Sequence, residues 1–148
     1  MASTTFSGPV TSTNGFIGAL TGNIAGTGSI THTPTAINAT ATATAAQVAT
    51  GYITSTSVGT VSITLPTGTL LGAALGATQG TVFDLYIDNT AGASVVTIVV
   101  AVNGILSTAA ADTPGSFGDL TVASGVTGVG RFTLMFSSAT AYVFTRTA

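Results

Sequence analysis

The single histidine and the aspartates are the residues of this sequence that could act in catalysis or bind a metal. A Ser-His-Asp triad would have to use His32, the only histidine, which lies in a Gly/Thr/Pro-rich segment that offers a catalytic base little rigid support. Asp84 and Asp88 share a predicted strand face, four residues apart, which separates their backbones by roughly 13 Å. Glycosidase carboxylates lie about 5–9.5 Å apart. We therefore predict that the chain is not an enzyme.

Metal and phosphate sites have equally few candidate residues. The chain contains no cysteine, which excludes disulfides and thiolate ligands, and no lysine, which excludes a Gly-Lys-Ser/Thr phosphate loop. A calcium site at Asp88 and Asn89 stays open, because carboxylate and carbonyl oxygens are the ligands that calcium prefers. We predict no metal site and no cofactor.

Charge is unusually scarce in this chain. Charged residues make up 4% of the sequence, whereas an ordinary soluble domain has roughly 25%. They are Arg131, Arg146, Asp84, Asp88, Asp112 and Asp119. Two arginines cannot form the basic patch that nucleic acids or anionic membranes require. A net charge of −2 gives little repulsion between copies, which favours association and predicts a subunit of an assembly.

Alternating apolar residues indicate strands over most of the remaining sequence. Val61, Ile63 and Leu65 share one face of 60–65, and Phe83, Leu85 and Ile87 share one face of 81–89. The β-branched run 95–102 reads as a strand buried on both faces, with a turn at Asn103-Gly104, and not as part of a membrane span at 93–111. A final hairpin is predicted from 131–137 and 140–146, which flank Ser138-Ala139.

Helical signals are weak. A narrow apolar stripe predicts one short helix at 69–77, and the Thr/Ala alternation at 40–44 predicts a poorly specified strand. The prediction is therefore an all-β chain, with a β-sandwich or jelly-roll-like body at 36–148.

Residues 1–35 are predicted to form an extended N-terminal arm. Glycines and Gly8-Pro9 interrupt this stretch too often for a long strand or helix. It nevertheless carries apolar residues that a solvated linker would not need. The candidate partner-binding residues are Phe6, Pro9, Val10, Phe16 and Ile17. Two interpretations stay open: the arm packs on its own body, or it anchors on a neighbouring subunit.

The two arginines fall near the ends of the predicted hairpin. Symmetric pairing about Ser138-Ala139 would set Arg131 opposite Arg146, which is unfavourable for like charges. Either a bulge shifts the register, or a carboxylate pairs with them. In that symmetric register Tyr142 and Phe144 lie on the face opposite Phe132. We therefore predict a subunit interface formed by Arg131, Tyr142, Phe144 and Arg146.

Two stretches resemble small virion structural proteins of tailed bacteriophages, among them capsid decoration (cement) proteins. They are FSGPVTSTNGFIG, residues 6–18, and QVATGYITSTSVGTVSITLPTGTLLGAALGATQGTVFDLYIDNTAG, residues 47–92, and they cover about 40% of the chain. The resemblance implies a trimeric, β-rich knob on the outer capsid surface, with an arm across the major capsid protein. It carries no catalytic motif.

Composition and resemblance together predict a virion structural protein. The expected role is a homotrimer that decorates and stabilises the shell by clamping neighbouring major capsid proteins, with no nucleic acid and no membrane as partner. The alternatives are a subunit of a phage tail, fibre or other extracellular filament, and a carbohydrate-binding β-sandwich. Tyr52, Tyr86 and Tyr142 are the only tyrosines that could form a sugar platform.

Overall fold

A computed structural model describes residues 31–106 and 119–148 of the chain. The residues predicted to bind a partner through the arm, Phe6, Pro9, Val10, Phe16 and Ile17, lie outside these ranges. The helices are α1 (Ala45–Ala49) and α2 (Gly68–Leu75), with a short 3-10 turn, η1 (Gly125–Thr127). The strands are β1 (Thr35–Ala36), β2 (Ala41–Thr42), β3 (Tyr52–Thr54), β4 (Val61–Thr64), β5 (Val82–Asp88), β6 (Val96–Val99), β7 (Gly104–Leu106), β8 (Thr121–Val122), β9 (Val129–Ser138) and β10 (Ala141–Arg146).

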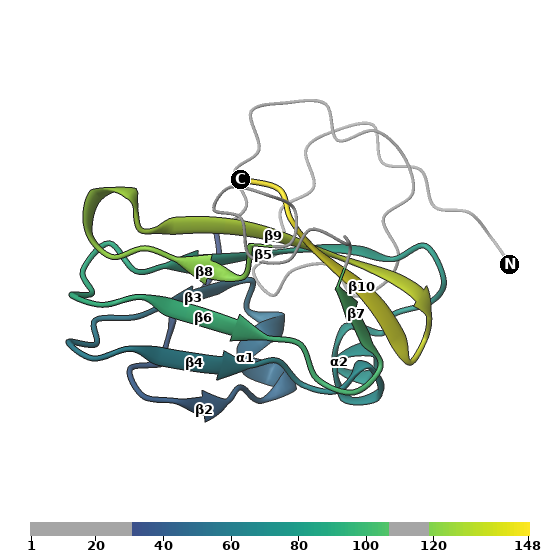
Figure 1. Cartoon of the computed structure of the whole chain (residues 1–148). Coiled ribbons are helices and arrows are strands. Elements are labelled where there is room, and N and C mark those ends of the chain that lie inside the picture. Colours follow the sequence, from purple (N-terminus) through teal and green to yellow (C-terminus); the bar gives the residue numbers. More distant parts are fainter. Residues whose placement is uncertain (1–30, 107–118) are drawn as a thin grey trace, which may run out of the picture. The chain divides into compact units, whose positions relative to one another are not determined.

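The described strands form two sheets, and the chain alternates between them. One sheet has the order β1-β3-β5-β9-β10-β7, and the other has the order β2-β4-β6-β8. Strands β1, β3 and β5 are parallel neighbours in the first sheet, and β2, β4 and β6 are parallel neighbours in the second. Figure 1 shows β4 and β6 side by side and the β9–β10 hairpin twisting across the molecule. The prediction of a mostly β chain is confirmed.

Apolar side chains from both sheets meet in one core. The first sheet contributes Ile53, Leu85, Ile87, Phe132, Leu134 and Phe144, and the second contributes Val61, Ile63, Val96, Ile98 and Val122. These residues follow the two-residue period of strands, because alternate side chains point to the same face. The predicted inward faces of 60–65 and 81–89 are confirmed, since Val61, Ile63, Leu85 and Ile87 are all buried.

The described part of the chain contains two α-helices, where one was predicted. Helix α2 lies at the predicted place: the Thr67 hydroxyl caps its first turn, and Gly76, with φ of 59°, ends it in a left-handed conformation. The weak strand predicted at 40–44 is present as β2, and helix α1, which was not predicted, follows it directly. A capping box starts this helix: the Thr44 hydroxyl accepts from the Gln47 amide, and the Gln47 side chain accepts from the Thr44 amide. None of the described helices is long and apolar enough to cross a membrane.

The β-branched run at 95–102 is shorter and less buried than predicted. Only 96–99 forms β6, in which Val96 and Ile98 are buried while Val99 is 40% exposed. The prediction of burial on both faces is wrong, because the sheet of β6 turns only one face toward the core. The predicted turn after the run is confirmed, and Asn103 adopts φ of 64° there.

Candidate functional site

A bulge sets the register of the β9–β10 hairpin. The shift lies between Ala141 and Tyr142, and it pairs Tyr142 with Phe136, Phe144 with Leu134, and Arg146 with Phe132. The symmetric register is therefore wrong, and the alternative of a bulge is confirmed. Arg131 no longer faces Arg146, so the repulsion between them disappears.

The bulge also moves Tyr142 and Phe144 to the inner face of the hairpin. Both side chains are fully buried in the core of their own chain, with Phe144 stacked on Phe132 at a centroid distance of 5.0 Å. The Tyr142 hydroxyl donates to the Pro66 carbonyl, and burial raises the pKa of Tyr142 to about 12. Their predicted place on an outer interface is wrong, because one extra residue in a strand exchanges its two faces.

Arg131 lies on the outer face of the first sheet. Its guanidinium donates to the Asp84 carboxylate at 2.5 Å and lies 5.8 Å from the centroid of the Tyr86 ring. Thr133 donates to the other Asp84 oxygen. These hydrogen bonds, from Thr133 first and Arg131 second, lower the pKa of Asp84. The pair is solvated, with 45% of the Arg131 side chain exposed.

Arg146, at the end of β10, is less exposed to solvent than Arg131. It lies 3.2 Å from the Asp119 carboxylate, and the two side chains are 16% and 7% exposed. Arg146 also donates to the Thr121 carbonyl, while Asp119 accepts from the Thr121 amide and hydroxyl. The prediction that an arginine pairs with a carboxylate is confirmed for both arginines. Their place at a subunit interface stays a prediction.

The groups with catalytic potential are held in structural contacts. The Asp88 carboxylate accepts from Thr90 and, at 2.6 Å, from the Tyr52 hydroxyl; these contacts lower the pKa of Asp88, whereas a general acid needs a raised one. The His32 Nδ1 atom forms a hydrogen bond with the Thr50 carbonyl oxygen. Within residues 31–106 and 119–148, no three His, Asp or Glu side chains gather as metal ligands would. Asn89 is buried, and its amide nitrogen contacts three backbone carbonyls, which links β5 to the end of β8.

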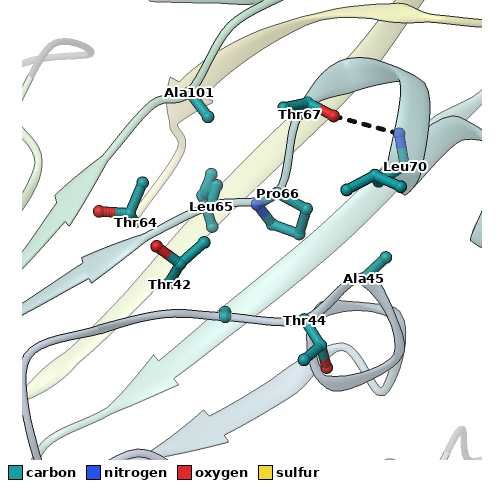
Figure 2. Close-up of a pocket in the computed structure, with 10 residues that line it drawn as sticks. Thr42, Thr44, Ala45, Thr64, Leu65, Pro66, Thr67, Leu70 and Ala101 are labelled. Atoms are coloured by element: carbon teal, nitrogen blue, oxygen red, sulfur yellow. Dashed lines mark hydrogen bonds between the residues drawn. The ribbon is translucent and has the colours of Figure 1, made fainter.

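The described residues form an apolar groove. It has a volume of about 630 Å³ and is lined by Thr42, Ala43, Thr44, Ala45, Thr64, Leu65, Pro66, Thr67, Leu70 and Ala101. In the view of Figure 2, Leu65 and Pro66 lie at the centre, between the 42–45 segment on one side and Thr67, Leu70 and Ala101 on the other. No charged side chain lines the groove. A ligand would therefore make mainly apolar contacts there, with threonine hydroxyl groups as its side-chain hydrogen-bond partners.

Two features make this groove suitable for another polypeptide. Leu65 and Ala43 are buried, whereas Leu70 is 60% exposed, so a large aliphatic side chain is left uncovered among the described residues. Strand β2 contributes Thr42; among the described strands it lies at the end of its sheet and pairs with β4 alone. Its other edge therefore offers backbone groups to a further strand.

Sequence reasoning did not find the groove. Its lining comes from β2, the start of α1, the end of β4, the start of α2 and Ala101, which are far apart in sequence. The only local signal is Leu70, which belonged to the predicted apolar stripe of the helix and yet points away from the core. Comparisons of the chain with family models, with curated proteins and with solved structures found no match.

Proposed function

We propose that this chain is a structural subunit that decorates the outside of a bacteriophage capsid and stabilises the shell by clamping neighbouring major capsid proteins. The observation that carries the proposal is an uncharged groove beside an edge of β2 that no described strand pairs, because such a surface can join this chain to another polypeptide of an assembly. Such a surface joins polypeptides non-covalently, through burial of apolar side chains and through backbone hydrogen bonds.

Composition and resemblance support the same role. A chain with 4% charged residues has little electrostatic protection against association, as suits a subunit whose surface is covered by partners. The resemblance of 6–18 and 47–92 to small virion proteins supports a homotrimer at the outer capsid surface. The two sheets over one core would then serve as the β-sandwich or jelly-roll body of such a knob, although β1, β3 and β5 pair in parallel.

Immunolabelling of intact virions tests the proposal. Antibodies raised against the chain should decorate the capsid shell in electron micrographs, and particles that lack the chain should disrupt at a lower temperature than complete particles. Labelling confined to a tail or fibre would replace the shell role with the filament role. Particles that carry no label would show that the chain is not a virion protein.

A further inference from the structure

We propose that the apolar groove binds the N-terminal segment 6–17 of a neighbouring copy of this chain, so that copies join by exchanging segments. The inference deepens the proposed function, on which it rests for the need to self-associate, and it names the partner of the groove. One copy would donate Phe6, Val10, Phe16 and Ile17, and the next would receive them between α1, α2 and the edge of β2.

The groove selects its occupant by the absence of charge. Its buried apolar lining residues are Ala43, Leu65 and Pro66, and the threonines that also line it carry neutral hydroxyl groups. A charged side chain would lose its hydration there and find no oppositely charged partner among the lining residues. Aromatic and aliphatic side chains on an uncharged backbone are the complementary ligand.

Residues 1–30 of the chain have that composition. None of them carries a charged side chain, and they include two phenylalanines and several aliphatic residues. A pair of phenylalanines can fill a large apolar groove, because each buries about 150–250 Å². The segment is therefore complementary to the groove in charge and in apolarity.

The edge of β2 adds a backbone contact to this match. In the parallel pair of β2 and β4, the Ala43 amide donates to the Thr64 carbonyl, so Ala43 turns its amide toward β4. Neighbouring residues of a strand alternate in the direction of their amides and carbonyls, which turns those of Thr42 toward the open edge. A segment lying along Thr42 would gain backbone hydrogen bonds while its side chains enter the groove.

Length and symmetry favour a second copy as the donor. The 13 residues between Ile17 and Thr31 can reach about 45 Å when extended, enough to cross to an adjacent subunit. Each copy would donate its segment 6–17 and receive the segment of another copy in the groove of its described residues, so the donating and the receiving parts differ. Contacts between two different surfaces close into a ring when the rotation between copies allows it, which fits the proposed trimer.

Disulfide trapping tests the exchange, and the absence of cysteine in the chain makes it clean. One full-length copy carries Phe16→Cys and a second, with a tag of different mass, carries Leu70→Cys; the two are co-expressed and oxidised. We expect a disulfide-linked product that contains one copy of each kind. Val126→Cys in place of Leu70→Cys is the matched control, because Val126 is 99% exposed and lies outside the groove.

Two results of the trapping would overturn the inference. If the mixed copies give no linked product while a single chain with both cysteines closes on itself, the groove holds the segment of its own chain. If neither arrangement links, the groove binds another partner.

A charge placed in the groove gives an independent test. Leu70→Asp should weaken self-association of the isolated protein at least tenfold in sedimentation, with the melting temperature of the body unchanged, since position 70 is exposed and an acidic residue suits the first turn of a helix. Val126→Asp should change neither quantity. Equal association of Leu70→Asp and wild type would contradict the inference. Because this assay contains no shells, a failure to label virions leaves its result unaffected.

Discussion

The two arginines of the β9–β10 hairpin share a charge but not an environment, and they should differ in their effect on stability. Arg146→Met removes the guanidinium from beside the Asp119 carboxylate, which is only 7% exposed, while the Thr121 amide and hydroxyl still donate to that carboxylate. Breaking such a pair costs about 3 kcal/mol, which for a chain of this size lowers the melting temperature by about 6–12 °C. Calorimetry of the variant measures this shift.

Arg131→Met is the control for that experiment. Its pair with Asp84 is open to solvent, and water and salt screen such a contact. We expect only a small change in melting temperature. Equal changes in melting temperature for the two substitutions would mean that the difference in burial does not make one ion pair more stabilising than the other.

Asp84 and Asp88 should make stability fall in acid. The pKa of each is lowered in the folded chain, that of Asp84 by Thr133 and Arg131 and that of Asp88 by Thr90 and Tyr52. A depressed folded pKa contributes stability that is fully present above the ordinary value near 4 and is lost as the pH falls through the folded value. Urea midpoints should therefore be constant from pH 7 to about pH 5 and decrease below about pH 4.

The double variant Asp84→Asn and Asp88→Asn isolates this contribution. Its urea midpoint should depend less on pH below 4 than that of the wild type, because Asn does not titrate. An unchanged acid slope would assign the effect to other carboxylates of the chain.

At the scale of elements, the sequence predicts strands well but not their partners. Alternation of apolar residues identified β4 and β5 because only one face of each enters the core. Nothing in that alternation shows that β1, β3 and β5 pair in parallel while β2, β4 and β6 build a second sheet, because partner choice depends on contacts between distant segments. The opposition of Arg131 and Arg146 in a symmetric hairpin made a bulge one of the predicted alternatives, but no sequence signal located it at Ala141 and Tyr142, where it reverses the predicted faces of β10.

Helix α1 was missed for a different reason. Its core contact is one residue, Val48, so its five residues give no apolar stripe. The signal that could have found it is the capping box of Thr44 and Gln47, which fixes a helix start without any periodicity. The groove was not predicted either, because the start of α1 forms part of its lining, next to residues of β2.

Gly72 of α2 provides a test of how this helix packs. In a solvent-exposed helix, Gly→Ala adds about 0.5–1 kcal/mol of stability. At position 72, however, a Cβ would lie 1.9 Å from the Ala139 carbonyl oxygen, at the turn of the β9–β10 hairpin. We therefore expect Gly72→Ala to destabilise the protein by about 1–3 kcal/mol in urea unfolding.

Gly59→Ala is the matched control, because a Cβ at that position meets nothing within 4 Å. It should leave the unfolding midpoint nearly unchanged. A stabilising effect of Gly72→Ala would show that α2 does not pack as closely on the hairpin turn as the structure has it.

At the scale of the whole molecule, the groove is a product of how the chain winds. Each time the chain crosses from one sheet to the other, it forms a connecting segment. Two of these connections contain the short helices that border the groove, α1 between β2 and β3 and α2 between β4 and β5. The same winding leaves β2 at the edge of its sheet. The topology therefore sets the uncharged, apolar groove beside an edge that no described strand pairs, and we propose that an uncharged segment of polypeptide binds there.

Deletion of 1–18 should separate folding from assembly. The core of the body is formed by buried residues between Ile37 and Phe144, so the truncated chain should unfold cooperatively with a melting temperature within a few degrees of wild type. The deletion removes Phe6, Pro9, Val10, Phe16 and Ile17, the residues predicted to bind a partner. The shortened protein should therefore sediment as a monomer and fail to load onto shells that lack the chain. Loading at wild-type occupancy would show that the body alone attaches to the capsid, and a loss of cooperative unfolding would show that the first 18 residues belong to the fold.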